Sequence, residues 1–518
     1  MVKFSPPLLG MFMVAATFYD AIVATTCGPS PDLNCCGMLV ASGLGDKVLL
    51  PNQTEYTSRL GSYWSVSAAL SPWCMVLPYT AEDVSSIIKT LVSGNCSFGV
   101  KGGGHGSFAL SNAVEDGVTI DFANMNGTTY NAETEVASIL PGGSWQEVYE
   151  TLAPHGVTVT GGRAGTVGIG GFLTGGGNSF HAASHGMACD TVVNFEVVIA
   201  DGSIINANAE QNPDLWIALK GGSANLGLVT RFDLRVIKFP DAAKPDIWGK
   251  FLSFDLADGD NAIDAMVNFT EHAHLDQNTS SIMFFGHIPA AGGMVLHLGL
   301  ENTKGIVDPP AVAGYLNAGK ILSTNSLVVP MADLVRSENP AQAAGVRNIW
   351  FTLTFKADAR VMKYAASRHT AAVAKLSASL SPDSNFTTMC AFQPLSHAIA
   401  QHGVRNGGNV MGLDYWMQNG DSGILLLLEL GVRGAENEAK AYPVMREWAR
   451  EVEAYARELG VAWEWRYLNY AGREQDPLAS IGPVALGRLR AAARKYDPDG
   501  VFQTLRGSGF KIPKGECD

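Results

Sequence analysis

The chain contains the segment Gly161-Gly-Arg-Ala-Gly-Thr-Val-Gly-Ile-Gly-Gly-Phe-Leu-Thr-Gly-Gly-Gly177, in which more than half of the residues are glycine. Two shorter clusters, Lys101-Gly-Gly-Gly-His105-Gly-Ser and Pro141-Gly-Gly-Ser, precede it within about 80 residues. Glycine lacks a Cβ, so its backbone N–H groups can converge into a concave nest that binds anions. Because the clusters follow or separate β-like runs, together they predict a long ligand with a diphosphate in its middle.

The spacing of the glycines excludes several common sites. The pattern G-x-G-x-x-G at the start of a helix is missing, so a Rossmann dinucleotide site is not indicated. The chain has no Walker A, H-E-x-x-H or G-x-S-x-G motif, which argues against phosphoryl transfer, zinc hydrolysis and serine hydrolysis. Tight turns between strands would explain each cluster alone, but they explain the three together poorly.

Composition narrows the class of protein further. Of the 518 residues, 47% are hydrophobic and 16% are charged, and the length suggests two or three domains. The net charge is -13 and no Lys/Arg-rich run occurs, so no nucleic-acid partner is expected.

The N-terminus has the features of a targeting segment. Lys3 precedes an apolar run from Leu8 to Ala24, which ends in small residues suited to signal peptidase. The run contains Tyr19 and Asp20, and its purely apolar part is short for a membrane span. We therefore expect a signal peptide over residues 1–24 and no integral membrane anchor, with a buried N-terminal helix as the alternative.

Sequons and cysteines indicate a secreted protein or one of the secretory pathway. Asn-x-Ser/Thr sequons begin at Asn52, Asn95, Asn126, Asn268, Asn278 and Asn385. Five of the eight cysteines precede residue 100, which suits disulfides in an oxidising compartment. We expect Cys36 to pair with Cys96. No metal site is expected, because Cys35 and Cys36 are adjacent and no C-x-x-C accompanies them.

Capping signals and periodicity outline the first half of the chain. Thr80 caps a helix with apolar residues at helical spacing, and Ser144 begins a second helix with Glu147 in a capping box. Val192 to Ala200 reads as a strand that turns at Asp201-Gly202. Further β-like runs are 98–100, 118–122, 136–140, 157–160 and 229–237.

The pattern of predicted secondary structure changes after Pro240 and Pro245. Strand-like runs recur at 282–288, 294–300, 349–356 and 424–430, and helices are expected at 360–380, 435–459 and 484–495. Such a pattern is typical of an antiparallel sheet covered by helices. The chain is therefore expected to be α+β.

Several motifs resemble those of berberine bridge enzyme-like oxidases, which have the vanillyl-alcohol-oxidase-type or PCMH-type FAD-binding fold. Besides the glycine clusters they are Asp116 to Asp121, Gly142 to Tyr149, Phe195 to Gly202, Leu219 to Thr230, Tyr467-x-Asn469 and Tyr496 to Phe502. The resemblance implies an FAD-binding domain of two α/β subdomains plus a substrate domain. The implied layout is 25–77 as an irregular N-terminal part of the FAD domain, 78–245 as its PCMH-type body, 246–450 as the substrate domain and 451–518 as a C-terminal return.

The resemblance implies a flavin joined covalently to the protein. The His that ends the first glycine loop in this family bonds the flavin 8α-carbon, and His105 holds that place. An imidazolyl substituent withdraws electrons from the ring and favours hydride acceptance. The other cofactor-binding residues implied are Lys101, Gly102, Gly103, Gly104, Gly106, Ser107, Gly142, Gly143, Gly162, Val167, Gly168, Gly170, Gly171, Phe172, Gly175, Gly176, Val229 and Asn469.

Three positions qualify the resemblance. Relatives with a second flavin bond carry Cys where this chain has Ala164, so we expect monocovalent FAD, which argues against an oligosaccharide substrate. Val167 occupies the family's oxygen-gate position, where a small residue admits O2. Phe172 replaces a His beside the flavin pyrimidine, which sets this chain apart from alkaloid-cyclising members.

Candidates for the substrate side rest on the same resemblance. Tyr467 is the candidate catalytic base, with Asn469 anchoring the flavin or that tyrosine, although Tyr467 would also suit an aromatic core. The run from Gly407 to Met411 resembles a strand where relatives place a catalytic carboxylate, and here that place is Met411. Gln393, Asn409 and Met411 are the candidate substrate wall.

We therefore expect an oxidase that transfers hydride from a small organic substrate to FAD and electrons on to O2, giving H2O2. The expected substrate is a secondary-metabolite alcohol, an aldehyde or a cyclising precursor. Two alternatives stay open, namely a carbohydrate oxidase of the same fold and a flavin-retaining protein that catalyses a non-redox cyclisation or only binds its ligand.

Overall fold

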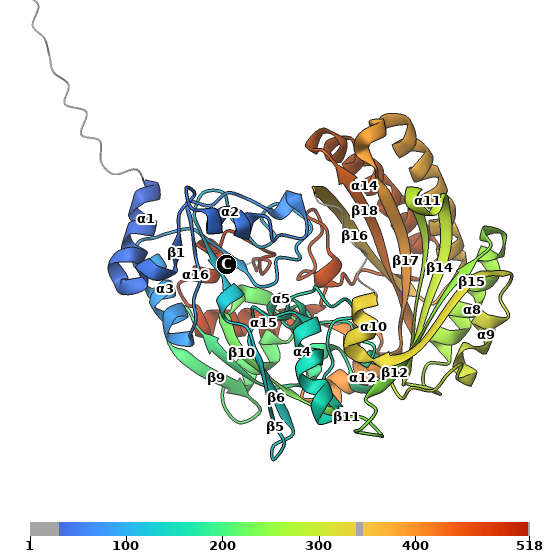
Figure 1. Cartoon of the computed structure of the whole chain (residues 1–518), viewed down its shortest axis with the longest axis horizontal. Helices are drawn as coiled ribbons and strands as arrows, with labels where there is room; N and C mark the ends of the chain where they lie inside the picture. The colour runs from blue at the N-terminus through green and yellow to red at the C-terminus, as the bar shows by residue number, and fades with distance from the viewer. Residues whose placement is uncertain (1–30, 338–344, 516–518) are drawn as a thin grey trace, which may run out of the picture.

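The computed structural model describes residues 31–337 and 345–515, and the signal peptide expected at 1–24 lies outside them. Figure 1 shows two halves, with the N-terminal elements and the last helices in one and a large sheet backed by helices in the other. This is the expected α+β architecture. No helix in the described part of the chain is long and apolar enough to cross a lipid bilayer.

The first sheet has the strand order β1-β2-β4-β3, with β2 and β3 both parallel to β4. Its strands are β1 (Val48–Leu49), β2 (Cys74–Val76), β3 (Phe98–Lys101) and β4 (Val118–Asp121). Helix α3 (Ala81–Ser93) connects β2 to β3, and the expected cap Thr80 forms a capping box with Asp83. The apolar stripe of α3 is buried, as its helical spacing predicts.

Two disulfides attach the helix α1 (Pro31–Leu39) to this sheet, and they correct one expectation. Cys36 pairs with Cys74 and Cys35 pairs with Cys96, so the expected bond between Cys36 and Cys96 is wrong. Adjacent residues point about 100° apart around a helix. The two cysteines of α1 therefore face different partners, one at the start of β2 and one just after α3.

The second sheet has the order β5-β6-β10-β8-β9 and is antiparallel throughout. Its strands are β5 (Thr128–Asn131), β6 (Val136–Ile139), β8 (Val192–Val198), β9 (Ile204–Asn208) and β10 (Leu228–Arg235). The hairpin of β8 and β9 confirms the turn expected at Asp201-Gly202. Helix α4 (Trp145–Leu152) begins with the expected capping box of Ser144 and Glu147, and the short α5 (Ile169–Thr174) follows inside the longest glycine segment.

The C-terminal segment returns to this half of the molecule. Helices α15 (Pro483–Tyr496) and α16 (Val501–Thr504) lie among the N-terminal elements in Figure 1. The Phe98 backbone N–H on β3 donates to the Leu505 carbonyl at 2.8 Å, and the Gly507 N–H donates back to the Phe98 carbonyl at 2.8 Å. The last residues thus form the outer neighbour of β3.

The other half contains an eight-stranded sheet of order β15-β12-β14-β13-β17-β18-β16-β19, whose neighbours are all antiparallel. Its strands are β12 (Asp246–Phe254), β13 (Thr279–Ile288), β14 (Gly293–Asn302), β15 (Ile321–Pro330), β16 (Val346–Lys356), β17 (Thr387–Leu395), β18 (Gly423–Arg433) and β19 (Ala462–Trp463). Helices α8 (Gly259–Glu271), α11 (Ala359–Ser379) and α14 (Ala435–Glu458) pack on one face of the sheet and form the largest apolar core with it. The opposite face is turned toward the half that carries the glycine clusters.

Short elements complete the description. The remaining helices are α2 (Thr54–Leu60), α6 (Ala182–His185), α7 (Pro213–Leu219), α9 (Ala313–Leu316), α10 (Met331–Ser337), α12 (His397–Arg405) and α13 (Leu413–Trp416), and β7 (Val157–Thr158) pairs with β11 (Ile237–Lys238).

Two segments expected as strands are irregular. The run 407–411 is a loop between α12 and α13, because Gly407 and Gly408 have φ of 92° and 88°, which lies outside the β region. Tyr467 is not on a strand either, since β19 ends at Trp463.

Candidate active site

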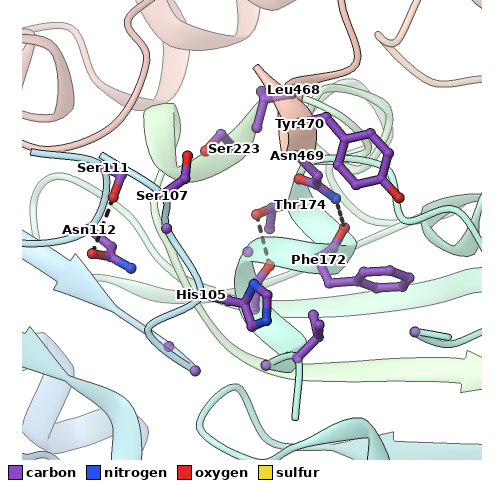
Figure 2. Close-up of a pocket in the computed structure, with 18 of the residues that line it drawn as sticks. His105, Ser107, Ser111, Asn112, Phe172, Thr174, Ser223, Leu468, Asn469 and Tyr470 are labelled. Carbon is purple, nitrogen blue, oxygen red and sulfur yellow. Dashed lines mark hydrogen bonds between the residues drawn. The ribbon is translucent and has the colours of Figure 1, made fainter. Parts of the chain in front are cut away.

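A cavity of about 500 Å³ lies between the glycine loops and the open face of the large sheet. All three glycine clusters contribute to its lining, and the sheet contributes residues from β13, β14, β16, β17 and β18. The two halves of the molecule therefore share one elongated pocket, part of which is drawn in Figure 2.

Most of the residues expected to bind the cofactor line this cavity. They are Gly102, Gly103, Gly104, His105, Gly106, Ser107, Gly162, Val167, Gly168, Gly170, Gly171, Phe172, Val229 and Asn469. A Cβ added to Gly103 would lie 2.4 Å from the Cα of Gly168, which is closer than any side chain tolerates. The absence of side chains at these two glycines lets the first and third loops touch and form one continuous cradle.

Five of the expected cofactor-binding residues lie behind that lining. Lys101 is fully buried, and its ammonium group contacts Asp121 at 3.0 Å and the Ser62 hydroxyl at 2.6 Å, so it fixes the base of the first loop. The other four, Gly142, Gly143, Gly175 and Gly176, are absent from the lining. A Cβ at Gly142 would lie 1.8 Å from the Phe122 carbonyl oxygen, so that glycine serves close backbone packing.

His105 projects into the cavity from the first loop (Figure 2). Its ring stacks on the indole of Trp64, with ring centroids 4.4 Å apart. The surrounding protein lowers the pKa of His105 to about 4 by desolvation, so the imidazole is neutral at physiological pH. A neutral imidazole held in place by stacking has a free nitrogen lone pair with which to form a bond.

Tyr467 is only 1% exposed, but it is one of the residues that line the cavity. Its hydroxyl accepts hydrogen bonds from the Asn178 backbone N–H at 2.8 Å and from the Asn469 amide at 3.1 Å, and burial raises its pKa. Asn469 also donates to the Phe172 carbonyl at 3.1 Å, a bond drawn in Figure 2. The expected pair is therefore brought together, with Tyr467 organising Asn469 and the turn at Asn178.

Tyr470 is the tyrosine that stands next to a charged group in the cavity wall. Arg163, from the third glycine segment, donates to the Tyr470 hydroxyl at 3.0 Å, and both residues line the cavity. An arginine so placed stabilises negative charge that develops on a phenol oxygen. Tyr470 was not among the residues predicted from the sequence, although it lies only three residues after Tyr467.

Two carboxyl groups in the sheet, one buried and one half-buried, also face the cavity and were not foreseen. Glu301 lies on β14 and Glu429 on β18. Burial raises the pKa of each carboxyl to about 7. A signal for Glu429 existed, because it interrupts the apolar run Ile424 to Leu430 of an otherwise buried strand.

The proteins most similar to this chain agree with a flavin site. Residues 72–208 match a family model described as an FAD binding domain. The FAD-dependent monooxygenase drtC of Aspergillus calidoustus is 37% identical over 498 residues, which cover 94% of this chain and 92% of that protein. The chain belongs to the same family of FAD-linked oxidoreductases as drtC, and it shares the fold of a berberine bridge enzyme-like protein from Physcomitrella patens. It is an FAD-dependent enzyme.

Solved structures of this fold include two sugar oxidases. A xylooligosaccharide oxidase from Myceliophthora thermophila C1, in complex with xylobiose, has a TM-score of 0.75 and 17% identity and covers 93% of this chain and 100% of its own. The glucooligosaccharide oxidase from Acremonium strictum has a TM-score of 0.72 and 17% identity over 92% of this chain and 98% of its own, and it is described with a 6-S-cysteinyl, 8α-N1-histidyl FAD. At such identities the likeness establishes the fold alone.

The residues expected as the substrate wall of this flavoenzyme lie below the cavity surface, and none of the three is part of its lining. Gln393 is buried, and its side-chain oxygen accepts hydrogen bonds from Arg163 and from the Asn178 amide. Asn409 donates to the Asp190 carboxylate at 2.7 Å, and the Met411 sulfur lies 3.7 Å from the Cys189 sulfur. Gln393 thus holds Arg163, while the other two pack further from the site.

Proposed function

We propose that this FAD-linked oxidoreductase is an oxidase that converts a small lipophilic alcohol to the carbonyl compound and reduces O2 to H2O2. The observation that carries the proposal is the half-buried Glu429 carboxyl, which faces the same cavity as the glycine cradle. When bound, FAD would act as a two-electron acceptor that takes hydride from the substrate and passes the electrons on to O2. The alcohol carbon loses hydride, its hydroxyl loses a proton, and both reach O2 as H2O2.

Glu429 acts as the general base in this proposal. With its pKa raised to about 7, its carboxylate is available at neutral pH and basic enough to take the hydroxyl proton. Tyr470 donates a hydrogen bond to the substrate oxygen, and Arg163 holds the Tyr470 hydroxyl in position. Tyr467 and Asn469, proposed at first as catalytic residues, support the loop that carries Phe172.

FAD is held through one covalent bond to His105 in this proposal. The glucooligosaccharide oxidase is described with histidyl and cysteinyl links, whereas this chain has Ala164 where the resemblance places the cysteine. His105 and Ala164 both line the cavity, which supports a histidyl link and leaves no thiol for the second. Val167 lines it too and supports access of O2.

The cavity wall favours a lipophilic substrate over a sugar. Between the two carboxyl groups the sheet contributes the apolar side chains of Ile282, Met389 and Leu427. A sugar would leave several hydroxyl groups without partners against such a surface, and unsatisfied buried polar groups are costly. The sugar oxidases of the same fold keep a carbohydrate oxidase as the second candidate.

Spectroscopy of the purified protein tests the proposal. We expect a yellow protein whose chromophore remains with the acid-precipitated chain and is bleached anaerobically by lipophilic alcohols but not by xylobiose. In air, H2O2 should form in a one-to-one ratio with the carbonyl product. A colourless acid precipitate contradicts the covalent link. Because drtC is named a monooxygenase, ¹⁸O from ¹⁸O2 in the carbonyl product, with no peroxide, would overturn the oxidase assignment.

We also propose that the enzyme is exported after removal of residues 1–24. The two disulfides support an oxidising compartment, and the sequon residues Asn52, Asn95, Asn126, Asn268 and Asn385 are exposed. N-terminal sequencing of the protein from culture medium tests this. Retention of the full chain inside cells would contradict it.

A further inference from the structure

Glu301 is a second carboxyl group of the cavity, distinct from the proposed base. We propose that Glu301 binds a hydroxyl group of the substrate that is remote from the carbon being oxidised. The natural substrate is then a lipophilic molecule with two oxygen functions, one at Glu429 and one at Glu301. This inference rests on the proposed function and specifies its substrate class.

The hydrogen bonds of Glu301 leave one oxygen free for a ligand. The side chain is only 2% exposed, yet it lines the cavity. One carboxyl oxygen, Oε2, accepts a hydrogen bond from the Ser280 hydroxyl at 2.6 Å. The other, Oε1, is buried without a hydrogen-bond partner among the described residues. A buried carboxyl oxygen without a partner is costly, and a ligand hydroxyl would remove that cost.

The position of Glu301 makes it a distant anchor rather than a second base. It lies on β14, and β13 and β17 separate that strand from β18, which carries Glu429. Three strand spacings correspond to about 14 Å across the sheet. The register also places Glu429 level with Val295 of β14, so Glu301 lies six residues, about 20 Å, further along the strands. The cavity residues on the strands from β13 to β18 include the apolar Ile282, Met389 and Leu427. The geometry therefore suits a molecule with an apolar body and polar groups at its two ends.

The charges near Glu301 favour a neutral hydroxyl group over an amine. Arg163 is close enough for its positive charge to oppose the rise in the pKa of Glu301 that burial causes. The same positive charge repels an ammonium group. With a pKa of about 7, the carboxyl is present in both forms near neutrality, so it can donate to a hydroxyl oxygen or accept from a hydroxyl proton.

Matched alcohols test the inference in the holoenzyme. The probes are terminal diols with chains of 10 to 18 carbons and the mono-alcohols and amino alcohols of the same lengths, and equilibrium binding is followed by the change in flavin absorbance. At the best-fitting length, the wild-type enzyme should bind the diol about tenfold or more tightly than the mono-alcohol. Glu301→Met, which keeps the length of the side chain but removes its polar atoms, should abolish this preference. Glu301→Gln should retain most of it, because an amide also donates and accepts.

The outcomes separate this inference from the proposed function. Equal binding of diol and mono-alcohol by the wild type, including no detectable binding of either, overturns the role of Glu301, as does an unchanged preference in Glu301→Met. A preference for the amino alcohol overturns the hydroxyl assignment. Failure of the bound diol to bleach the flavin contradicts the oxidase proposal instead, and Glu429→Gln should slow bleaching without changing the preference.

Discussion

The two walls of the active-site cavity are built in opposite ways. The FAD-binding wall is made of backbone, with glycines such as Gly103 and Gly168 so close that neither tolerates a side chain. The sheet wall is made of side chains that project from regular strands, with Glu301 and Glu429 among apolar neighbours. A backbone cradle imposes one residue type at many positions, whereas a sheet face can change its chemistry by single substitutions. The comparison suggests that the first wall fixes the cofactor and the second fixes the substrate.

The largest expected effect tests the sheet wall. Glu429→Gln keeps the shape of the side chain but cannot accept the substrate proton, so anaerobic flavin bleaching should slow by about 10³-fold. Flavin content and thermal stability should be close to those of the wild type. If the bleaching rate of Glu429→Gln falls by less than about tenfold, another group is the base. Tyr470→Phe is then the next variant to measure.

The next effect tests the backbone wall. Gly103→Ala forces a methyl group against the Gly168 backbone, so we expect a loss of about 2 kcal/mol in stability and a marked loss of bound flavin. Gly487→Ala is the matched control, because Gly487 lies in α15 with nothing within 4 Å of an added Cβ. The free energy of unfolding of this control variant should rise by about 0.5 kcal/mol. Thermal unfolding measures the stability of each variant, and the flavin-to-protein absorbance ratio measures its bound flavin. Equal effects of the two substitutions would contradict the close contact of Gly103 with Gly168.

The pH dependence of reduction provides a finer test of the sheet wall. The pKa of Glu429 is raised to about 7, and only the carboxylate can accept a proton. The rate of flavin bleaching should therefore rise about tenfold per pH unit below pH 7 and level off above it. Stopped-flow measurements across this range give the profile. A profile that is flat from pH 5 to 8 would exclude a base with this pKa, and Glu429→Gln should lack the inflection.

The smallest expected effect concerns Tyr467, whose hydroxyl accepts hydrogen bonds from Asn178 and Asn469. Tyr467→Phe leaves the Asn178 backbone N–H and the Asn469 amide without their shared acceptor, which should cost about 1 kcal/mol of stability. Because Tyr467 is proposed to support the site, the rate of bleaching should change little. A loss of rate comparable to that of Glu429→Gln would restore Tyr467 as the catalytic tyrosine.

Local signals predicted the elements whose causes are local. The capping boxes at Thr80 and Ser144 and the turn at Asp201-Gly202 appear where the sequence places them, because each depends on neighbours within three residues. Strand β15 was not foreseen because its residues are mostly exposed and lack apolar alternation. Strand β12 was also missed, because its buried and exposed residues alternate poorly.

Features that depend on contacts between distant parts of the chain could not be predicted from the sequence alone. The disulfide partners of Cys35 and Cys36 depend on which neighbouring element each side of α1 faces. The glycine segments indicated the cofactor because glycine marks close backbone approach wherever the partner lies. Glu301 gives no such signal, since its role depends on strands that pair far apart in the sequence and bring it opposite Arg163.

The exchange of backbone hydrogen bonds between Phe98 and the segment from Leu505 to Gly507 has a consequence for biosynthesis. Strand β3 leads directly into the loop of His105, so the scaffold of that histidine gains its outer neighbour only after Leu505 to Gly507 have been synthesised. A nascent chain that still lacks these residues has an incomplete docking surface. Removal of the chain from Leu505 onward should therefore leave β3 without this neighbour, and the truncated protein should bind less flavin than the full chain.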